Sequence, residues 1–494
     1  MNYKIAVNNI KIALINPGPG ESLQRGRILA NADRGYPPLG ICYLSSMLKE
    51  HNYNVDLIDQ AATNLNLDDL MKWIKKLDPE IIGFSTLTVS GSGMNAALIA
   101  REIKKWNSEV KIVFGNRHAT VNDYKILNKY PQVDICVRDE GEFTFLELVR
   151  ALERRESLQD INGITYRSNG RIIRNDKREL IENLDILPFP DRKSLNFNYK
   201  GSYGNLDLGP EKFAMIISSR GCPYQCTFCY GRRKVGFRVR SIENVMEEIL
   251  YLDSEGYKAL IFTDDNFTFS KKRIIKLCQL MRKNKVEMNW FCEGRVNQVS
   301  NEMLREMRRS NCRLLMFGIE SANQRFLDYY KKKITPDQSI LAVKKARKAK
   351  IPFIVGSFIV GGPSESLTEI YNTLKFAQKL DLDFPLFNIL GITPGTDVWD
   401  DMVEKKFLDE EIYWEEGVRV SDIDPDGVST KVISNLILKM LKKFFSNPKY
   451  LLKALLRTTM SSYRVSKFLN ILTTNISNFE NFHGVRSFWN PDYV

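Results

Sequence analysis

Short apolar runs alternate with amphipathic stretches from residue 11 to about residue 155. Runs such as KIALIN, EIIGFSTLT and KIVFG fit buried strands, and stretches such as LDDLMKWIKKL and MNAALIAREIKKW fit helices with one apolar face. This alternation is typical of parallel sheets with helices on both faces, whose ligands bind at the carboxyl ends of the strands. We therefore predict an N-terminal α/β domain over residues 1–155 with a doubly wound parallel sheet.

A hairpin and a linker are predicted next, in residues 156–205. The segment ITYRSNGRIIR offers a two-residue turn at Asn169 and Gly170, a pair that favours a tight hairpin. The following ILPFPDR contains two prolines, which interrupt regular structure and indicate a domain boundary.

A second alternating series occupies residues 206–400. It runs from AMIISS through KALIFTDDN, EMNWFCEGR, RLLMFGIES and PFIVGSFIVGG to FPLFNILGI. Six strands with intervening helices predict a partial (β/α)6 barrel, in which catalytic residues lie at the carboxyl ends of the strands. The alternation stops near residue 400, and residues 401–494 are predicted to form a helical, basic region.

The composition is that of a globular protein, with 494 residues, 43% hydrophobic and 27% charged. No cationic segment with an apolar core opens the chain, and no run of about 18 apolar residues occurs, so we expect a cytoplasmic protein. Eight cysteines in this length are too few for a disulfide framework. Five of them are scattered and are expected to be small core residues: Cys42, Cys136, Cys278, Cys292 and Cys312.

The net charge of +13 comes largely from the C-terminal region, where residues 431–494 contain ten Lys or Arg and two Asp or Glu. No RNA-binding module accompanies this charge, so nucleic acid is not the expected partner, although an RNA substrate stays open. The segments NLILKMLKKFF and YLLKALLRTTM combine lysines with apolar faces. Such helices make a peripheral contact with an anionic membrane, cover the open side of the barrel, or do both.

Three cysteines, Cys222, Cys226 and Cys229, follow the first predicted barrel strand with the spacing C-x3-C-x2-C. A structural zinc site usually has a fourth Cys or His, and a conventional iron–sulfur cluster usually has four cysteines. Three thiolates leave one iron of a [4Fe-4S] cluster open for another ligand. The alternative is a zinc site completed by a distant side chain.

With Phe228 before the third cysteine, this motif resembles the signature of the radical S-adenosylmethionine (SAM) superfamily. The resemblance implies a [4Fe-4S] cluster on the three cysteines, with SAM bound to the open iron and in contact with Phe228. It also implies a one-electron reductant such as ferredoxin or flavodoxin, and cleavage of SAM to methionine and a 5′-deoxyadenosyl radical.

Further strand ends resemble the SAM site of the same family. Asp264 and Asp265 stand where the family often has Gly-Gly-Glu, which meets the SAM amino group. Arg295 can grip the SAM carboxylate, or it is a surface arginine.

Glu320 matches a position that binds the ribose hydroxyls; its alternative is a carboxylate at a helix start. Gly361 and Gly362 resemble a motif that packs against adenine.

The N-terminal domain resembles the cobalamin (B12)-binding domains that precede the barrel in one radical SAM subgroup. No Asp-x-His-x-x-Gly motif is present, so cobalt would have no histidine ligand. Asn116 replaces a glycine that is frequent in the subgroup, so a cobalamin-free domain is the alternative. His118 is interpreted as a hydrogen-bonding loop histidine near the ligand. The residues expected beside cobalamin are Asp59, Ser85, Thr88, Gly115 and His118.

The expected activity is radical functionalisation of an unactivated carbon, with methylation from methylcobalamin preferred and a lipid or isoprenoid-like molecule as one candidate among small-molecule substrates. The alternative enzyme uses the same radical for cyclisation, carbon–carbon coupling or dehydrogenation without cobalamin. A non-enzymatic cobalamin or iron–sulfur sensor is a third class, which requires an occupied fourth cluster position.

Overall fold

The computed structural model describes residues 10–19, 36–88, 91–199, 212–230 and 236–467, with the backbone of two short strands at 202–203 and 206–207. The chain forms two compact units. The first consists of Met1–Tyr199 together with Glu410–Gly417, and the second of Lys200–Asp409 together with Val418–Val494.

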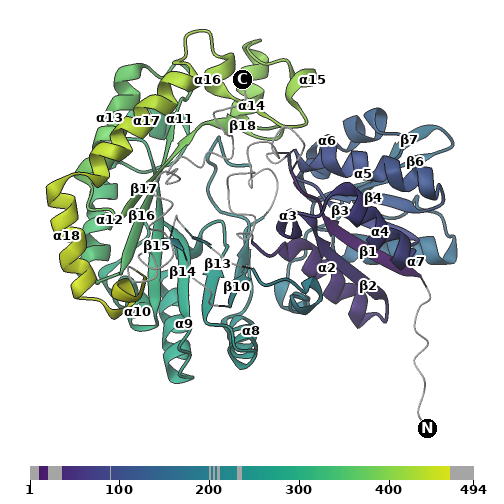
Figure 1. Cartoon of the computed structure of the whole chain (residues 1–494), viewed down its shortest axis with the longest axis horizontal. Coiled ribbons are helices and arrows are strands. Elements are labelled where there is room, and N and C mark those ends of the chain that lie inside the picture. The colour runs from purple at the N-terminus through teal and green to yellow at the C-terminus, as the bar shows by residue number, and fades with distance from the viewer. Residues whose placement is uncertain are drawn as a thin grey trace. The chain divides into compact units, whose positions relative to one another are not determined.

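The first unit contains a seven-stranded sheet in the order β2-β1-β3-β4-β5-β6-β7 (Figure 1). The first five strands in sequence are parallel, as predicted, because a helix returns the chain between consecutive strands. These strands are β1 (Lys11–Asn16), β2 (Asn54–Asp59), β3 (Ile81–Ser85), β4 (Lys111–Gly115) and β5 (Ile135–Val137). The helices are α2 (Leu39–Glu50), α3 (Gln60–Thr63), α4 (Leu67–Leu77), α5 (Ser92–Trp106), α6 (Asn116–Lys129) and α7 (Glu142–Arg154).

The predicted hairpin is present as β6 (Ile164–Ser168) and β7 (Arg171–Arg174). Asn169 and Gly170 both have positive φ, 48° and 76°, as a two-residue hairpin turn requires. Because β6 pairs antiparallel with β5, the hairpin extends the N-terminal sheet. It is therefore part of the first unit, and only short 3-10 turns follow it: η2 (Leu184–Ile186) and η3 (Lys193–Leu195).

The second unit contains the predicted partial barrel, a six-stranded parallel sheet in sequence order (Figure 1). Its strands are β10 (Phe213–Ile216), β13 (Ala259–Phe262), β14 (Asn289–Arg295), β15 (Cys312–Glu320), β16 (Phe353–Val360) and β17 (Phe384–Ile389). The helices are α8 (Ile242–Ser254), α9 (Lys271–Lys283), α10 (Asn301–Arg309), α11 (Gln324–Tyr329), α12 (Pro336–Lys348), α13 (Leu367–Lys379) and α14 (Asp397–Glu404). Short elements complete it: β8 (Ser202–Tyr203), β9 (Leu206–Asp207), β11 (Ser219–Arg220), β12 (Arg238–Val239), η4 (Phe267–Phe269), β18 (Gly391–Ile392), β19 (Val418–Arg419) and α16 (Val420–Ile423).

The C-terminal region does not form a separate body. Helix α17 (Thr430–Phe445) packs against α13 and β17 (Figure 1), so its apolar face covers the barrel. Helix α15 (Glu410–Tyr413) belongs instead to the first unit. Helix α18 (Pro448–Thr459) follows α17, and residues 468–494 of the predicted basic region lie outside the described residues. Within the described ranges, no helix is long and apolar enough to cross a membrane.

Candidate functional site

The three predicted cluster cysteines lie on one loop, after β10 and the short strand β11. Cys222, Cys226 and Cys229 form no disulfide with any described residue. The other five cysteines form none either and are buried, as expected for core residues. The loop therefore presents three thiols at the carboxyl end of the first barrel strand, where this architecture places its chemistry.

Two contacts fix the cysteine loop to the end of α11. The backbone N–H of Thr227 donates to the carbonyl of Tyr330 at 3.1 Å, and its hydroxyl donates to the carbonyl of Tyr329, also at 3.1 Å. The ring of Phe228 meets Tyr330 edge-on, with centroids 5.2 Å apart. The predicted contact of Phe228 with SAM stays a prediction, because its observed partner is Tyr330.

Arg295, the last residue of β14, points toward the cysteine loop and is buried. Its Nη1 donates to the Sγ of Cys226 at 3.8 Å, and its guanidinium lies 3.6 Å from the ring centroid of Tyr224. Its Nη2 donates to the carbonyl of Lys332. Its Nε has no hydrogen-bond partner among the described residues. This burial excludes the surface-arginine interpretation and leaves a buried cation with one N–H donor that no described residue accepts.

The donor set fits a four-iron cluster better than a single metal ion. No three His, Cys, Asp or Glu side chains of the described residues converge on one point as zinc ligands must. The thiolates of a cluster bind different irons and need not converge in this way. Three thiols on one loop, one beside a buried guanidinium, therefore fit a [4Fe-4S] cluster, and Arg295 fits the carboxylate of SAM.

The two candidate aspartates after β13 have different surroundings. Asp264 is buried and accepts hydrogen bonds from the N–H and hydroxyl of Ser218, at 3.2 and 2.7 Å, and from the hydroxyl of Ser219. It therefore holds the turn before the cysteine loop. Asp265 is exposed. Burial raises the pKa of Cys222, and the charge of Asp265 adds to this effect. Asp264 is therefore held by the protein, and Asp265 is the better candidate to contact a ligand bound to the cluster.

Glu320 forms a buried ion pair with Lys332, a partner that the sequence does not indicate. Glu320 ends β15 with a φ of 64°, so it belongs to a strand and not to a helix start. Gly318 makes room for the pair, because a Cβ there would lie 2.5 Å from Oε1 of Glu320 and 2.7 Å from Nζ of Lys332. Lys332 lies in a run of three lysines, a pattern that predicts a solvent-exposed surface. Contact of Glu320 with the ribose stays a prediction.

The two glycines after β16 are surrounded by protein side chains. A Cβ at Gly361, whose φ is 74°, would lie 3.0 Å from Cδ1 of Ile433. A Cβ at Gly362 would lie 2.6 Å from Oη of Tyr330. Packing accounts for both residues, and their predicted contact with adenine is untested.

Several buried polar groups around this end of the barrel were not found from the sequence. Burial raises the pKa of Glu365 to about 7, although its Oε2 accepts from the N–H of Gly362 at 2.9 Å. The other oxygen of Glu365 has no partner among the described residues. The same holds for one buried side-chain atom each of Asn266, Gln298 and Tyr330. Single polar residues of this kind carry no sequence signal.

In the first unit the parallel strands have the order 2-1-3-4-5, and this order reverses between β1 and β3. Ligands of such sheets bind at this point of reversal. Asp59 is buried there and accepts from Nδ2 of Asn16 at 2.7 Å and from the hydroxyl of Tyr199 at 2.8 Å. Ser85 accepts from Nδ2 of Asn116 at 3.0 Å. Ser85 and Gly115 are half-buried at the strand ends and can meet a ligand, whereas Asp59 is engaged by protein groups.

His118 lies in α6 instead of the predicted loop, and it is completely buried. Its Nδ1 lies 3.0 Å from the hydroxyl of Thr88, and its ring stacks on Trp414 with centroids 5.6 Å apart. A Cβ at Gly93 would lie 2.5 Å from the ring. Burial lowers the pKa of His118 to about 3. This imidazole is enclosed by protein and is not available to bind cobalt. If a corrin binds at the carboxyl ends of β1 and β3, His118 is therefore not its ligand.

Comparison with known proteins identifies the family. A sequence model of the radical SAM superfamily matches residues 216–377. An uncharacterised methyltransferase of Pyrococcus horikoshii is 37% identical over 453 residues, which cover 90% of this chain and 94% of that protein. The chain belongs to the radical SAM superfamily. A B12 binding domain model matches residues 27–149 of this radical SAM protein, and the two domain matches confirm the predicted cofactors: a [4Fe-4S] cluster, SAM and cobalamin.

More distant relatives of this radical SAM protein have different activities in their names. The anaerobic magnesium-protoporphyrin IX monomethyl ester cyclase of Rubrivivax gelatinosus is 26% identical and covers 84% of this chain and 75% of its own length. The radical SAM methyltransferase TsrM of Kitasatospora setae, solved with tryptophan and a SAM analogue, has a TM-score of 0.65 at 15% identity. That match covers 80% of this chain and 76% of TsrM. TsrM shows that the fold is shared.

Proposed function

We propose that this radical SAM protein is a cobalamin-dependent C-methyltransferase that acts on an unactivated carbon. The observation that carries the proposal is its 37% identity, over 90% of the chain, to a protein named a methyltransferase, together with its B12-binding domain. The buried Arg295 beside Cys226 supports SAM binding at the cysteine loop.

The chemistry supplied by the bound cofactors is a 5′-deoxyadenosyl radical from one SAM and a methyl group from methylcobalamin. In the balanced reaction a substrate C–H bond breaks, its hydrogen goes to 5′-deoxyadenosine, and a C–CH3 bond forms. A second SAM would supply the methyl group that methylcobalamin gives up and would be released as S-adenosylhomocysteine. Two electrons enter in one-electron steps from a reductant such as ferredoxin or flavodoxin.

The residues of the chain hold and orient these groups. Cys222, Cys226 and Cys229 would bind three irons, and Arg295 would pair with the carboxylate of SAM. Asp265 is the candidate for the amino group of SAM. Glu320, paired with Lys332, would accept hydrogen bonds from the ribose. This pair and Arg295 are buried, so their charges are largely shielded from solvent.

The test uses full-length protein purified without oxygen, with a reconstituted cluster and added cobalamin. It is incubated with a reductant, a cell extract as the substrate source, and SAM labelled with a CD3 group. Methyl transfer predicts bound cobalamin, equal amounts of 5′-deoxyadenosine and S-adenosylhomocysteine, and a product in which CD3 replaces hydrogen. Release of 5′-deoxyadenosine without S-adenosylhomocysteine contradicts the proposal.

The second candidate is radical cyclisation, carbon–carbon coupling or dehydrogenation without methyl transfer. Its support is the cyclase of Rubrivivax gelatinosus, which matches 84% of this chain. It consumes one SAM per turnover and forms no S-adenosylhomocysteine, so the same experiment separates the two reactions.

For the substrate we propose a lipid or isoprenoid-like molecule with an unactivated carbon. The support is indirect: the apolar and basic helix α18 provides a surface suited to lipid. A labelled product that partitions into the organic phase of the extract would support this class, and a water-soluble labelled product would contradict it.

A further inference from the structure

The apolar face of α18 points to solvent. None of the twelve residues of this helix is buried. Its leucines recur on one face, and the exposed fractions are 52% for Leu451, 60% for Leu452, 60% for Leu455 and 53% for Leu456, with 81% for the following Met460. A surface helix of a globular protein normally turns such a face toward the core. Helix α18 is therefore inverted relative to the usual arrangement.

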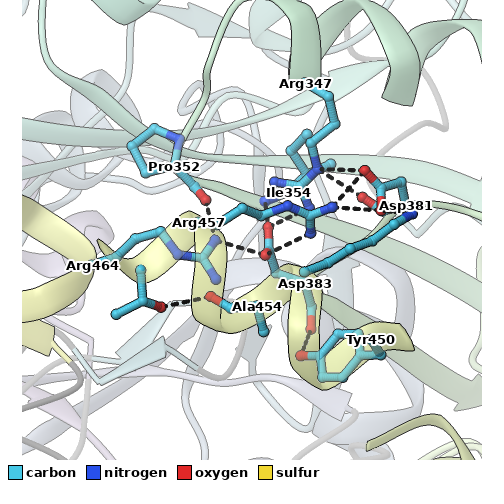
Figure 2. Close-up of polar contacts among 11 residues, drawn as sticks. Arg347, Pro352, Ile354, Asp381, Asp383, Tyr450, Ala454, Arg457 and Arg464 are labelled. Carbon is cyan, nitrogen blue, oxygen red and sulfur yellow. Dashed lines mark hydrogen bonds and ion pairs between the residues drawn. The ribbon is translucent and has the colours of Figure 1, made fainter. Parts of the chain in front are cut away.

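The polar face of α18 is bound to the barrel, as Figure 2 shows. Arg457 donates two hydrogen bonds to the carboxylate of Asp381, at 2.5 and 2.6 Å, and Lys453 lies 3.2 Å from the same carboxylate. The hydroxyl of Tyr450 donates to the carbonyl of Asp383 at 2.8 Å. The spacing of 450, 453 and 457 places the three side chains on one helix face. These bonds keep the leucines on the opposite, outer face.

A buried charge cluster holds this attachment in place. Asp383 accepts from the guanidinium of Arg347 at 2.6 Å, from Arg464 at 2.7 Å and from the N–H of Ile354 at 2.7 Å (Figure 2). Arg464 also donates to the carbonyl of Pro352 at 2.7 Å. Rotation of α18 to bury its leucines would break its bonds to the two aspartates beside these buried charges, which is unfavourable.

Helix α17 shows the ordinary arrangement and is the internal comparison. Its residues Ile433, Ile437, Met440 and Leu441 are buried in the hydrophobic core of the barrel. Of the two predicted roles for the C-terminal helices, covering the barrel therefore belongs to α17. The leucines of α18 are left without such a role.

The chain segment that contains α18 carries charge of one sign. Residues 430–467 contain nine Lys or Arg and no Asp or Glu. Lys439, Lys442, Lys443 and Lys449 are exposed and form no ion pair with any described residue. Cores of protein–protein interfaces are enriched in aromatic residues and depleted in lysine, whereas leucines flanked by lysines favour an anionic lipid surface. The charge complementarity therefore indicates a membrane and not a protein partner.

We propose that α18 docks its apolar face on the surface of a membrane that contains anionic lipids. The helix is about 18 Å long and would lie in the plane of the headgroups. Its contacts with Asp381 and Asp383 lie just before the amino end of β17, whereas the cysteine loop follows the carboxyl end of β10. Docking would thus bring the enzyme to the membrane and leave the cluster end of the barrel free.

The test is flotation of full-length protein, with its cluster reconstituted, on vesicles of phosphatidylcholine alone or mixed with phosphatidylglycerol. The expected result is binding to the mixed vesicles that weakens with salt. The double variant Leu452→Gln/Leu455→Gln should reduce the bound fraction at least about tenfold. Ile186→Gln/Ile412→Gln is the matched control, because these isoleucines are 53% and 67% exposed in the first unit and should not matter.

Three outcomes would overturn the proposal. The first is no flotation of the intact protein with mixed vesicles at low salt. The second is equal binding by the α18 variant and the control, with circular dichroism showing that both are folded. The third is a dimer that forms without vesicles and is lost in the α18 variant, which would make this face an interface between copies. Flotation needs no turnover, so its result is independent of the proposed methyl transfer.

Discussion

The Nη1 of Arg295 lies 3.8 Å from the Sγ of Cys226, although 69 residues separate the two along the chain. The contact joins the end of β14 to the cysteine loop and places a buried cation beside one of the three thiols. Because Nε of the same guanidinium has no partner among the described residues, the cation can also meet a carboxylate. The guanidinium of Arg295 would then contact both the cluster and the carboxylate of SAM.

Replacement of Arg295 by glutamine should weaken SAM binding without loss of the cluster. A charge-assisted hydrogen bond contributes about 1.5 to 3 kcal/mol, so we expect a loss of affinity of roughly tenfold to a hundredfold. Equilibrium dialysis with SAM on the reconstituted protein measures it. Arg313→Gln is the control, because Arg313 lies near the start of β15, away from the loop, and SAM affinity should not change. Wild-type affinity in Arg295→Gln would remove Arg295 from the site.

Replacement of Glu320 by alanine should have two effects. SAM affinity should fall, because the predicted ribose acceptor is lost, while the cluster still assembles. The free energy of unfolding should also fall, by about 3 to 5 kcal/mol, since Lys332 is left buried without its partner. The double variant Glu320→Gln/Lys332→Met removes the unpaired charge and should recover stability but not affinity. SAM binding that is unchanged in both variants would contradict the assignment.

The sequence predicts the two sheets and the cysteine loop well, because these features are local. Apolar runs such as KIVFG and IIGFS form strands of the expected parallel sheet, and Cys222, Cys226 and Cys229 lie within one loop. The partners of the site side chains lie far away along the chain, so local sequence patterns could not predict these contacts. Trp414 stacks on His118 across nearly three hundred residues, and Lys332 is hidden in a lysine run.

The orientation of α18 shows a second limit. Its pattern of leucines and lysines predicts an amphipathic helix equally well for a buried or an exposed apolar face. Asp381 and Asp383, which lie on another segment, bind the polar face of the helix and so determine that its apolar face is exposed. Only the structure brings these charges together.

Loss of the Asp383 carboxylate should destabilise the second unit. Burial alone would raise the pKa of Asp383, but the charges of Arg347 and Arg464 outweigh it and hold the pKa below its ordinary value. Its contribution is therefore present above about pH 4 and is lost as the pH falls below that. Asp383→Asn should lower the free energy of unfolding by about 3 to 5 kcal/mol in urea denaturation at pH 7. Asp68→Asn, which removes an exposed charge, should change it by less than about 0.5 kcal/mol.

Acid should loosen the first unit through His118. The pKa of this imidazole is about 3 when folded because it is buried, and about 6.5 when unfolded. The unfolded chain binds the extra proton between these values, so stability is complete above about pH 6.5 and falls by up to about 1.4 kcal/mol per pH unit below it. Hydrogen exchange of α6, corrected for intrinsic rates, should report this slope between pH 7.5 and 5.5. His118→Gln should flatten it, and an unchanged slope in that variant would contradict the mechanism.

Release of 5′-deoxyadenosine from SAM by the full-length, reconstituted protein tests the central claim most directly. The wild type should release it only with a reductant. Cys222→Ala, Cys226→Ala and Cys229→Ala should each lose both the absorption of the [4Fe-4S] cluster and this product, because two thiolates cannot hold the cluster with one iron open. Cys278→Ala, Cys292→Ala and Cys312→Ala should keep both, since these thiols are in the core. A variant of the triad that kept a complete cluster and formed 5′-deoxyadenosine would contradict the account.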